Sequence, residues 1–492
     1  MQNGKCFFVL LIWLLVFPGI QNPYHAQDTQ PSKPLNIVLI LTDDQSAHLS
    51  VLGTPGIKTP HVDALAKKSV LFTNAFAVVP SCSPSRSSIM TGMYPHANGH
   101  WRNTITPSLA DPDVEFTKAG THIDEVGIHE YLKTLPEILQ ENGYYTAITQ
   151  KFHMSPPWKF PYNGRSDVHN DPEAYKSEIQ NFITAAGGQP FFIQANIAAP
   201  HRPFGSHMKR FPGFLPDKNA IAVPGFLADT PLMREDLQQY YGSVQLADAC
   251  AGAILETLKN NNLDQNTLVI YTSDQGMAYH RAKASAYYAG LHVPLIVSGP
   301  GVIQNKQTDA LVSLIDLMPT LLDFAELPIP NQVQGKSLWG ILAGKQNEIE
   351  DREYVFGEHN SHGPPRDEHY PSRAAFDGRY YYILNLMPAK AYVLPADLRQ
   401  QQGWGNLSYT ATLQAKETHP QAYKLLQTLE SGRPAEELYD MQNDPFQLEN
   451  LADSQAHTAI LKRFREKMAT WRKETGDLAN DPLQIKTRQQ TR

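Results

Sequence analysis

Short apolar runs rich in β-forming residues recur along the first part of the chain. Four of them stop at ionisable side chains, as buried parallel strands do when they end at a polar edge. The runs cover residues 35–41 before Asp43 and Asp44, 144–149 before Lys151 and His153, 190–198 before His201, and 267–273 before Asp274. Apolar residues at helical spacing lie between them, over 62–68, 134–142, 236–260 and 314–324. This alternation predicts an α/β fold with a mostly parallel central sheet flanked by helices.

The carboxyl ends of these predicted strands are the expected place of a functional site. Open parallel sheets bind their ligands in the crevice outside those ends. Charges on ordinary surface loops would be scattered along both edges of the sheet. The ionisable residues that follow all four runs therefore favour a site at one edge.

The pattern changes at about Asp351, where aromatic and polar residues begin to alternate and a Tyr380–Tyr382 cluster appears. We expect a smaller antiparallel C-terminal subdomain over residues 351–485, after a catalytic domain over 34–350. Its last element, residues 459–474, has helical periodicity with both signs of charge on its outer face. A length of 492 residues agrees with one large domain and a smaller companion.

The N-terminus resembles an export signal. Lys5 precedes an apolar run over residues 7–17, and small residues occur near Ala26. We expect a cleaved signal peptide over 1–26 and export to a periplasmic, secreted or lysosomal-type compartment. An uncleaved anchor is the alternative. No later stretch reaches the roughly 20 apolar residues that a membrane span needs, so no membrane partner is expected after cleavage.

Net charge and cysteine content argue against a nucleic-acid-binding protein and against a disulfide-held fold. The net charge is −7 without a basic stripe, so nucleic acid is not expected as a partner. Only Cys6, Cys82 and Cys250 occur, which excludes a disulfide framework. Cys250 lies in a helical pattern that predicts a buried thiol. Cys82 instead lies where a helix is expected to begin, and unpaired N–H groups there favour an anion and would lower its pKa.

The segment Cys82-Ser-Pro-Ser-Arg86, followed by Thr91-Gly92, resembles the signature of the formylglycine-dependent sulfatases. The resemblance extends over nearly the whole mature chain and implies an alkaline-phosphatase-like fold. It also implies that a formylglycine-generating enzyme converts Cys82 to formylglycine, whose hydrated form carries two hydroxyls for attack on a sulfate group. Arg86, by the same match, stabilises the modified residue.

The resemblance assigns roles to the residues at the strand ends. Asp43, Asp44, Asp274 and Gln275, with the modified Cys82, match the ligands of one divalent cation, Ca²⁺ or Mg²⁺, although the family more often has Asn or His at the position of Gln275. Lys151 and Lys283 match sulfate-binding cations. His153 matches the base that takes a proton from the second hydroxyl, and His201 a histidine that contacts sulfate and the leaving atom.

The C-terminal part looks most like the sulfamidase branch, whose members are N-sulfoglucosamine sulfohydrolases acting on heparan-type chains. Tyr370-Pro-Ser-Arg373 carries this likeness, and we expect it to form one wall of a closed pocket that admits a chain end. Arg373 is then a candidate for binding sugar, with a structural ion pair as the alternative. Further candidates for the sugar subsite are Arg102, His359, His362 and Arg366.

Several functions stay open at this point. The substrate is expected to be a sulfated carbohydrate, and an O-sulfate is the alternative to the N-sulfate of glucosamine. A phosphoester or phosphonate hydrolase of the same superfamily is a second enzyme class. An inactive, exported carbohydrate-binding protein is the non-enzymatic alternative. The sequence leaves the oligomeric state open.

Overall fold

The structure is a computed structural model that describes Met1 and residues 35–105, 109, 125–363, 369–392, 394, 395, 398 and 406–477. Apart from Met1, the expected signal peptide lies outside these residues, as does Arg366. Residues Leu35–Arg492 form one compact unit. It contains two sheets, while the expected domain boundary at residue 350 stays a prediction. No helix in the described part of this chain is long and apolar enough to cross a membrane.

The larger sheet has eight strands in the order β4-β3-β5-β1-β6-β7-β2-β8. All neighbouring strands run parallel except at β7, which is antiparallel to both β6 and β2. The strands are β1 (Asn36–Thr42), β2 (Val70–Phe76), β3 (Tyr145–Thr149), β4 (Gly164–Ser166), β5 (Phe191–Ile197), β6 (Thr267–Ser273), β7 (His292–Ser298) and β8 (Lys306–Ser313). The predicted mostly parallel sheet is confirmed, and β1, β3, β5 and β6 are the four predicted strands.

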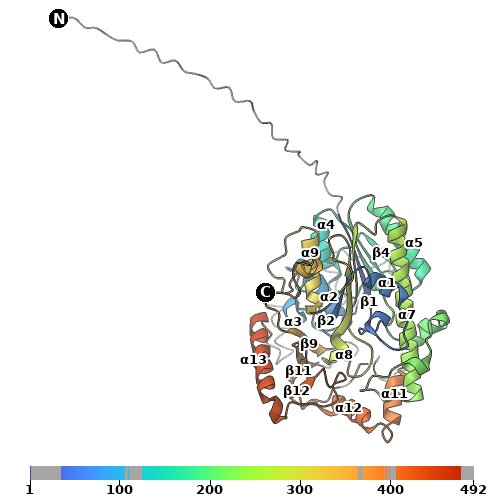
Figure 1. The fold of residues 1–492 in the computed structure, drawn as a ribbon, viewed down its shortest axis with the longest axis vertical. Coiled ribbons are helices and arrows are strands. Elements are labelled where there is room, and N and C mark those ends of the chain that lie inside the picture. Colours follow the sequence, from blue (N-terminus) through green and yellow to red (C-terminus); the bar gives the residue numbers. More distant parts are fainter. Residues whose placement is uncertain are drawn as a thin grey trace. The chain divides into compact units, whose positions relative to one another are not determined.

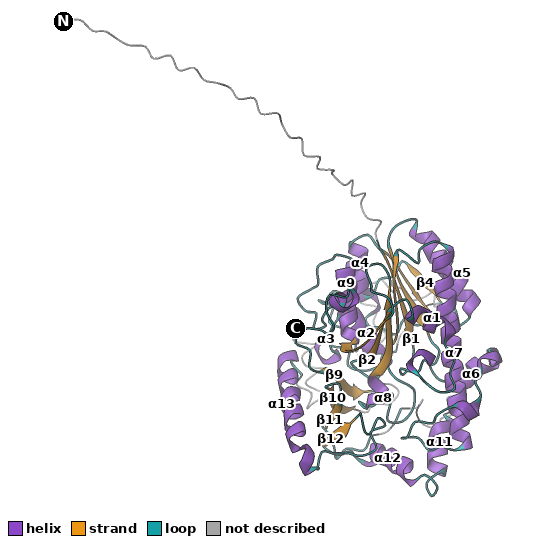
Figure 2. Ribbon diagram, in the orientation of Figure 1, coloured by secondary structure: helices purple, strands orange, loops and turns teal. Residues whose placement is uncertain are grey.

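Helices cover both faces of this sheet (Figures 1 and 2). All seven residues of β1 are buried because its side chains alternate between two apolar clusters. Ile37 and Leu39 belong to the cluster that includes Met90 and Leu321, whereas Val38 and Ile40 belong to the one with Leu246. The helices are α1 (Pro60–Ala66), α2 (Cys82–Thr91), α3 (Pro95–Asn98), α4 (Leu135–Glu141), α5 (Pro172–Ala186), α6 (Phe204–Arg210), α7 (Pro231–Asn260), α8 (Tyr288–Leu291), α9 (Leu317–Phe324), α10 (Trp339–Leu342), α11 (Leu407–Gln414), α12 (Pro420–Ser431) and α13 (Thr458–Thr475).

The second sheet is antiparallel, as the change of pattern after residue 351 predicts. Its order is β12-β11-β10-β9, with β9 (Val355–Ser361), β10 (His369–Phe376), β11 (Tyr380–Asn385) and β12 (Glu436–Asp440). Helix α13 packs against it through Phe464, Met468 and Trp471. The two sheets meet where the N–H of Glu358 donates to the carbonyl of Val78, at 2.7 Å. The C-terminal sheet therefore adjoins the segment that leads from β2 into α2.

Candidate active site

The loops after four adjacent strands meet at one edge of the larger sheet. Strand β1 lies between β5 and β6, and β5 pairs with β3 on its other side. Asp43 and Asp44 follow β1, His201 follows β5, and Asp274 with Gln275 follows β6. The left-handed backbone of Asp44, with φ of 65°, turns the chain directly after the strand. Parallel strand ends thus bring side chains together that lie up to 231 positions apart in sequence.

Cys82 is the first residue of α2, as the sequence predicts, and Gly92 ends this helix in the left-handed conformation. The Cys82 Sγ lies 3.4 Å from Oδ1 of Asp43 and 3.2 Å from Nε2 of Gln275. Burial and the charge of Asp43 raise the pKa of the thiol well above its usual value. The expected lowering of this pKa by the helix N-terminus is therefore wrong. An unmodified thiol at this position would not be an activated nucleophile.

Cationic side chains surround the buried carboxylates. Lys151 donates to Asp43, and Lys283 Nζ lies 2.8 Å from Oδ2 of Asp44. Arg86 donates through Nε to Asp274 at 2.9 Å. Although burial opposes the charge of Lys151, Asp43 raises its pKa, so this ammonium stays protonated. Two ammonium groups and one guanidinium therefore lie against the carboxylates beside Cys82.

Each of the two site histidines is held at one ring nitrogen. His153 Nε2 lies 2.9 Å from the carbonyl oxygen of Thr104, so Nε2 carries the proton and Nδ1 is left as an acceptor. His201 Nδ1 is likewise bound by the carbonyl of Arg202, and its Nε2 lies 3.4 Å from Lys283 Nζ. Burial, followed by Lys151 for His153 and by Lys283 for His201, lowers the pKa of both rings. Both histidines are therefore neutral near pH 7.

The donor set at this edge suits a hard divalent cation. Ligand atoms of Asp43, Asp44, Cys82 and His201 all lie within 4.8 Å of one another. Gln275 Oε1 is buried and makes no hydrogen bond in the structure, while its Nε2 points at Asp44. Turning this amide by half a turn would present the oxygen to the same cluster. Buried oxygen ligands of this kind fit Ca²⁺ or Mg²⁺.

Asp274 lies at the back of this cluster. Its Oδ2 is taken by Arg86, and its Oδ1 accepts the main-chain N–H groups of Asp44 and Gln275 at 3.2 and 2.9 Å. Burial, followed by repulsion from Asp43, raises the pKa of Asp274 to about 7. A cation in contact with these carboxylates would oppose that repulsion. The place of Asp274 in the ligand set stays a prediction.

The expected sugar-binding residues divide into two groups. His362 lies at the N-cap of α2, with Nδ1 3.3 Å from Ser81 Oγ and Nε2 3.3 Å from Asn103 Nδ2. Arg102, half-buried, donates to the carbonyl of Asn103 at 2.8 Å. His359 is instead fully buried against Tyr392.

The expectation for Arg373 is wrong. This side chain is fully buried in β10, and all five of its N–H groups find acceptors. Nε and one Nη bind the two oxygens of Asp477, and the remaining donors bind the carbonyls of His359 and Ser372 and the amide oxygen of Asn360. The structural ion pair is the correct alternative. Tyr370 is buried as well, so Tyr370-Pro-Ser-Arg373 is an interior strand and not a pocket wall.

The sequence analysis did not identify the polar residues that surround the N-terminal end of α2. Asn103 accepts from the N–H of Ser83 at 2.9 Å, and Thr104 holds His153 through its carbonyl. His100 lies 2.7 Å from Ser87 Oγ through Nδ1 and 3.3 Å from Thr104 Oγ1 through Nε2. These residues lie in a loop without periodicity, and a main-chain carbonyl leaves no signal in a sequence.

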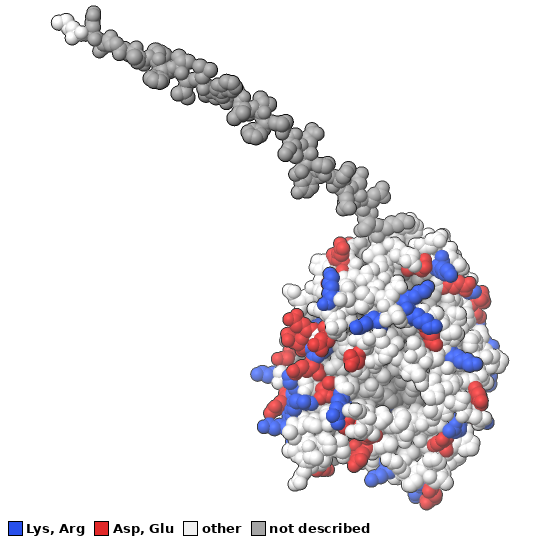
Figure 3. Space-filling model, in the orientation of Figure 1, with Lys and Arg blue, Asp and Glu red and all other residues white. Residues whose placement is uncertain are grey.

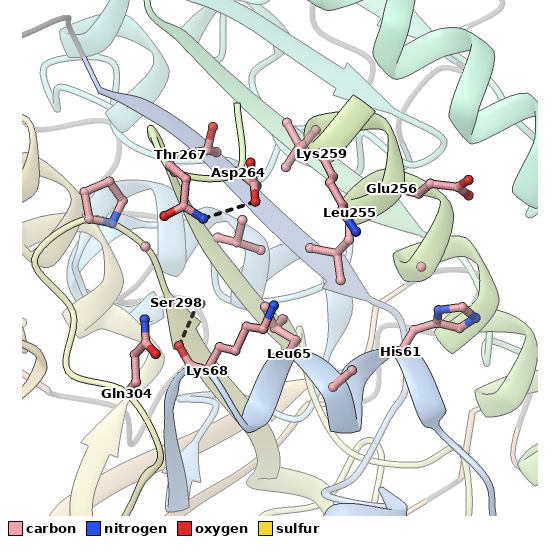
Figure 4. A pocket seen from close by; sticks show the side chains of 17 residues that line it. His61, Leu65, Lys68, Leu255, Glu256, Lys259, Asp264, Thr267, Ser298 and Gln304 are labelled. Carbon is pink, nitrogen blue, oxygen red and sulfur yellow. Dashed lines mark hydrogen bonds between the residues drawn. The ribbon is translucent and has the colours of Figure 1, made fainter. Parts of the chain in front are cut away.

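A second pocket, of about 500 Å³, lies at the opposite edge of the sheet between α1, α7 and the start of β6 (Figure 4). Lys259, in the last turn of α7, and Lys68, two residues after the end of α1, extend into it. Figure 3 shows basic side chains gathered over this part of the molecule. Lysines at helix C-terminal ends are accounted for by the negative ends of the helix dipoles. Because none of the residues discussed above lines this pocket, it is separate from the candidate active site.

Comparison with known proteins agrees with the site at the strand ends. A family described as Sulfatase matches residues 35–327, which include every residue of the cluster around Cys82. The chain belongs to the sulfatase family. It is accordingly an enzyme, a sulfuric ester or sulfamidate hydrolase, and the inactive alternative is wrong. A second match, to the C-terminal part of N-sulphoglucosamine sulphohydrolase, covers residues 279–385 and confirms the resemblance to the sulfamidase branch.

The sequence identities to individual relatives are low, although the matches cover most of the chain. It is 29% identical to human N-sulphoglucosamine sulphohydrolase over 91% of both chains. It is 27% identical to an ulvan-active sulfatase of Formosa agariphila, over 92% of this chain and 77% of the other. A solved structure described as in complex with its substrate D-glucosamine-2-N,6-O-disulfate has a TM-score of 0.66 at 19% identity, covering 92% of this chain and 100% of the other. That last likeness shows the alkaline-phosphatase-like sulfatase fold.

Proposed function

We propose that this sulfatase removes a sulfate group from a glycosaminoglycan-type oligosaccharide by means of a formylglycine at position 82. The observation that carries the proposal is the position of Cys82 at the start of α2, within 3.4 Å of Asp43. Its sequence context, Cys-Ser-Pro-Ser-Arg, is intact. The raised thiol pKa argues against catalysis by unmodified cysteine, and the proposal includes a formylglycine-generating enzyme as the partner that modifies it.

Formylglycine, when hydrated, supplies two hydroxyls, one that attacks sulfur and one whose deprotonation releases the sulfate afterwards. His153 is the base for that deprotonation, because its Nδ1 is a bare acceptor. Lys151 and Lys283 are hydrogen-bonded to Asp43 and Asp44, which lie beside Cys82. In this proposal the two ammonium groups bind the sulfate oxygens. Arg86 binds Asp274 and lies 3.7 Å from Asp43. Its positive charge offsets the negative charge of these carboxylates next to residue 82.

One divalent cation completes the site in this proposal, with Ca²⁺ preferred to Mg²⁺ for an irregular set of oxygen ligands. Asp43, Asp44, Asp274 and Gln275 would hold it, together with the modified residue 82. When bound, it would polarise the sulfate and neutralise the clustered carboxylates. The buried, unpartnered Oε1 of Gln275 supports this assignment.

For the substrate, we favour the N-sulfate of a terminal glucosamine. The match of residues 279–385 to the C-terminal part of N-sulphoglucosamine sulphohydrolase supports it, as does the 29% identity to the human enzyme. Nitrogen leaves poorly unless protonated, and His201, which lies beside Lys283, would be the acid. The negative charge of a bound sulfate would favour the protonated ring.

Together with the apolar N-terminal run, these relatives support an exported enzyme.

The ulvan-active relatives favour a second candidate, cleavage of an O-sulfate on another polysaccharide. A deciding assay compares sulfate release from N-sulfated glucosamine with release from the 2-O-, 3-O- and 6-O-sulfated sugars. A tetrasaccharide that carries the same group at its end or only internally would distinguish action at the chain end from action in the middle. Activity confined to an O-sulfate would refute the N-sulfate assignment. Sulfate release from none of these sugars would contradict the glycosaminoglycan proposal.

A further inference from the structure

One loop, from β6 to β7, carries both Gln275 and Lys283. Its backbone is left-handed at Arg281 and Ala284, with φ of 60° and 58°, on either side of Lys283. Non-glycine residues in this conformation cost free energy and persist only where the surroundings hold them. The N–H of Ala284 donates to the carbonyl of Pro80 at 2.8 Å, two residues before Cys82. The shape of this loop therefore sets where Lys283 lies relative to the nucleophile.

The loop is fixed from outside by the C-terminal sheet, through a buried carboxylate. Glu437 on β12 is 2% exposed. It accepts from Tyr287 Oη at 2.9 Å, from the hydroxyl of Tyr439 and from Asn385 Nδ2 at 2.8 Å. Tyr287 follows Lys283 by four positions, so this hydrogen bond fixes the loop on the C-terminal side of the lysine.

Arg281 fixes the loop on the other side. Its buried guanidinium lies 3.9 Å from the centre of the Tyr287 ring and donates to the carbonyl of Gln447. Burial opposes the charge of this guanidinium, and the nearby carboxylate of Glu437 raises its pKa. The main-chain N–H of Tyr288 also binds Gln447, and the hydroxyl of Tyr381 donates to the carbonyl of Ala286 at 2.9 Å. Both flanks of Lys283 are thus tied to the C-terminal sheet or to the segment that follows β12, and neither holds a residue of the catalytic edge.

We propose that Glu437 is a positioning residue for Lys283, acting through Tyr287 and Arg281. The inference rests on the proposed role of Lys283 in binding the sulfate group. A carboxylate is costly to bury unless its oxygens are satisfied, and here the donors that satisfy it belong to the catalytic loop and to its own sheet. The Glu-Leu-Tyr-Asp segment at 437–440 gains a function by this route. Glu437 in this segment holds the ammonium group of Lys283 in place without touching the substrate.

The test is a double-mutant cycle with Glu437→Gln and Lys283→Ala. In one orientation the new NH₂ faces the hydroxyls of Tyr287 and Tyr439, and in the other it faces Asn385 Nδ2 while a neutral oxygen replaces the carboxylate as the acceptor for Tyr287. Either way the anchor of the loop is weakened, because a hydrogen bond to a charged group is the stronger one. Displacement of a catalytic group by about 1 Å can lower the rate by about 10²-fold, and we expect Glu437→Gln to lower kcat/KM by roughly 10- to 100-fold. In the Lys283→Ala background the same change should have little further effect.

Glu436→Gln is the matched control, because Glu436 is the preceding residue of β12 and binds Tyr382 and Arg465 instead of the loop. It should leave kcat/KM unchanged. If Glu437→Gln lowers activity equally in both backgrounds, its role is structural and the inference is wrong; the same holds if it has no effect on the parent enzyme. If Lys283→Ala itself keeps full activity, the proposed role of Lys283 fails instead. Binding of inorganic sulfate, measured by calorimetry, should weaken in both single variants, which gives a readout independent of turnover.

Discussion

The Sγ of Cys82 lies 3.4 Å from Oδ1 of Asp43, and both side chains are buried. A thiol held against a carboxylate in the protein interior stays protonated, which supports the proposed modification of residue 82. This contact also places whatever group residue 82 carries next to the carboxylates that would bind a cation. Two predictions follow from it directly, one for the nucleophile and one for the metal.

Cys82→Ala should abolish turnover, by about 10⁴-fold or more, as removal of a nucleophile does in other hydrolases. Peptide mass spectrometry of the active enzyme should find an aldehyde at position 82. The matched control is Cys250→Ala, because Cys250 is equally buried but lies in α7. That variant should keep its activity per folded molecule. Fully active enzyme with only a thiol at position 82 would contradict the mechanism.

Asp43→Asn should lose the bound cation and the activity together, because it removes a charged ligand from the cluster of Asp43, Asp44 and Cys82. Elemental analysis of the purified protein should find one Ca²⁺ or Mg²⁺ per chain, and a chelator should remove both metal and activity. Gln275→Asn keeps the amide oxygen at a shorter reach and should retain part of both. Asp309→Asn, at an exposed position of β8, is the control. A metal-free, fully active enzyme would refute the assignment.

The acid limb of the kcat profile should lie below about pH 6.5, the ordinary pKa of histidine, because His153 acts on the covalent intermediate. His153 must be neutral to act as a base, and burial together with the charge of Lys151 holds its pKa well below the usual value. Activity is then retained as the pH falls, until it passes that lowered pKa. Lys151→Met removes a positive neighbour, so the pKa of His153 should rise and the limb should move to higher pH. A limb that stays in place in this variant would show that His153 is not the titrating base.

Arg373→Gln should lower the free energy of unfolding by about 1–3 kcal/mol, because the buried carboxylate of Asp477 loses the two hydrogen bonds from Arg373 and keeps the one from Arg472 Nε. The KM for the substrate should stay the same, since all the N–H groups of Arg373 are already bound and none is free for a sugar. Urea unfolding and steady-state kinetics on the same preparation would check both. A raised KM with unchanged stability would restore Arg373 as a residue that binds the substrate.

The same pair gives a pH dependence of stability. Although burial raises the pKa of Asp477, the Arg373 ion pair outweighs it and holds that pKa well below the usual value. The stabilisation is therefore present above about pH 4, the unfolded pKa, and is lost as the pH falls towards the folded one. Asp477→Asn should unfold more easily than the parent at pH 7. The difference should shrink in acid, and a difference independent of pH would exclude this linkage.

Local pattern was enough to find the elements and much of the chemistry. The run at residues 35–41 and the carboxylates after it predicted β1 and its polar end, because strand formation and burial on both faces leave a mark in consecutive residues. Gly92 predicted the end of α2 for the same reason, since the left-handed position there favours glycine. The placement of Asp43, His201 and Asp274 at one edge followed from the direction of parallel strands.

What the sequence could not decide depends on neighbours that are distant along the chain. The antiparallel insertion of β7 between β6 and β2 arises from pairing over long loops. Arg373 was equally compatible with a sugar and an ion pair until Asp477, 104 positions later, proved to be its partner. The pKa of Cys82 was predicted with the wrong sign, because burial and Asp43 outweigh the helix N-terminus. The resemblance of the Cys82–Arg86 motif thus indicated the reaction, whereas the partners that each polar group finds, and with them its charge state and its free donors, were decided by the tertiary structure.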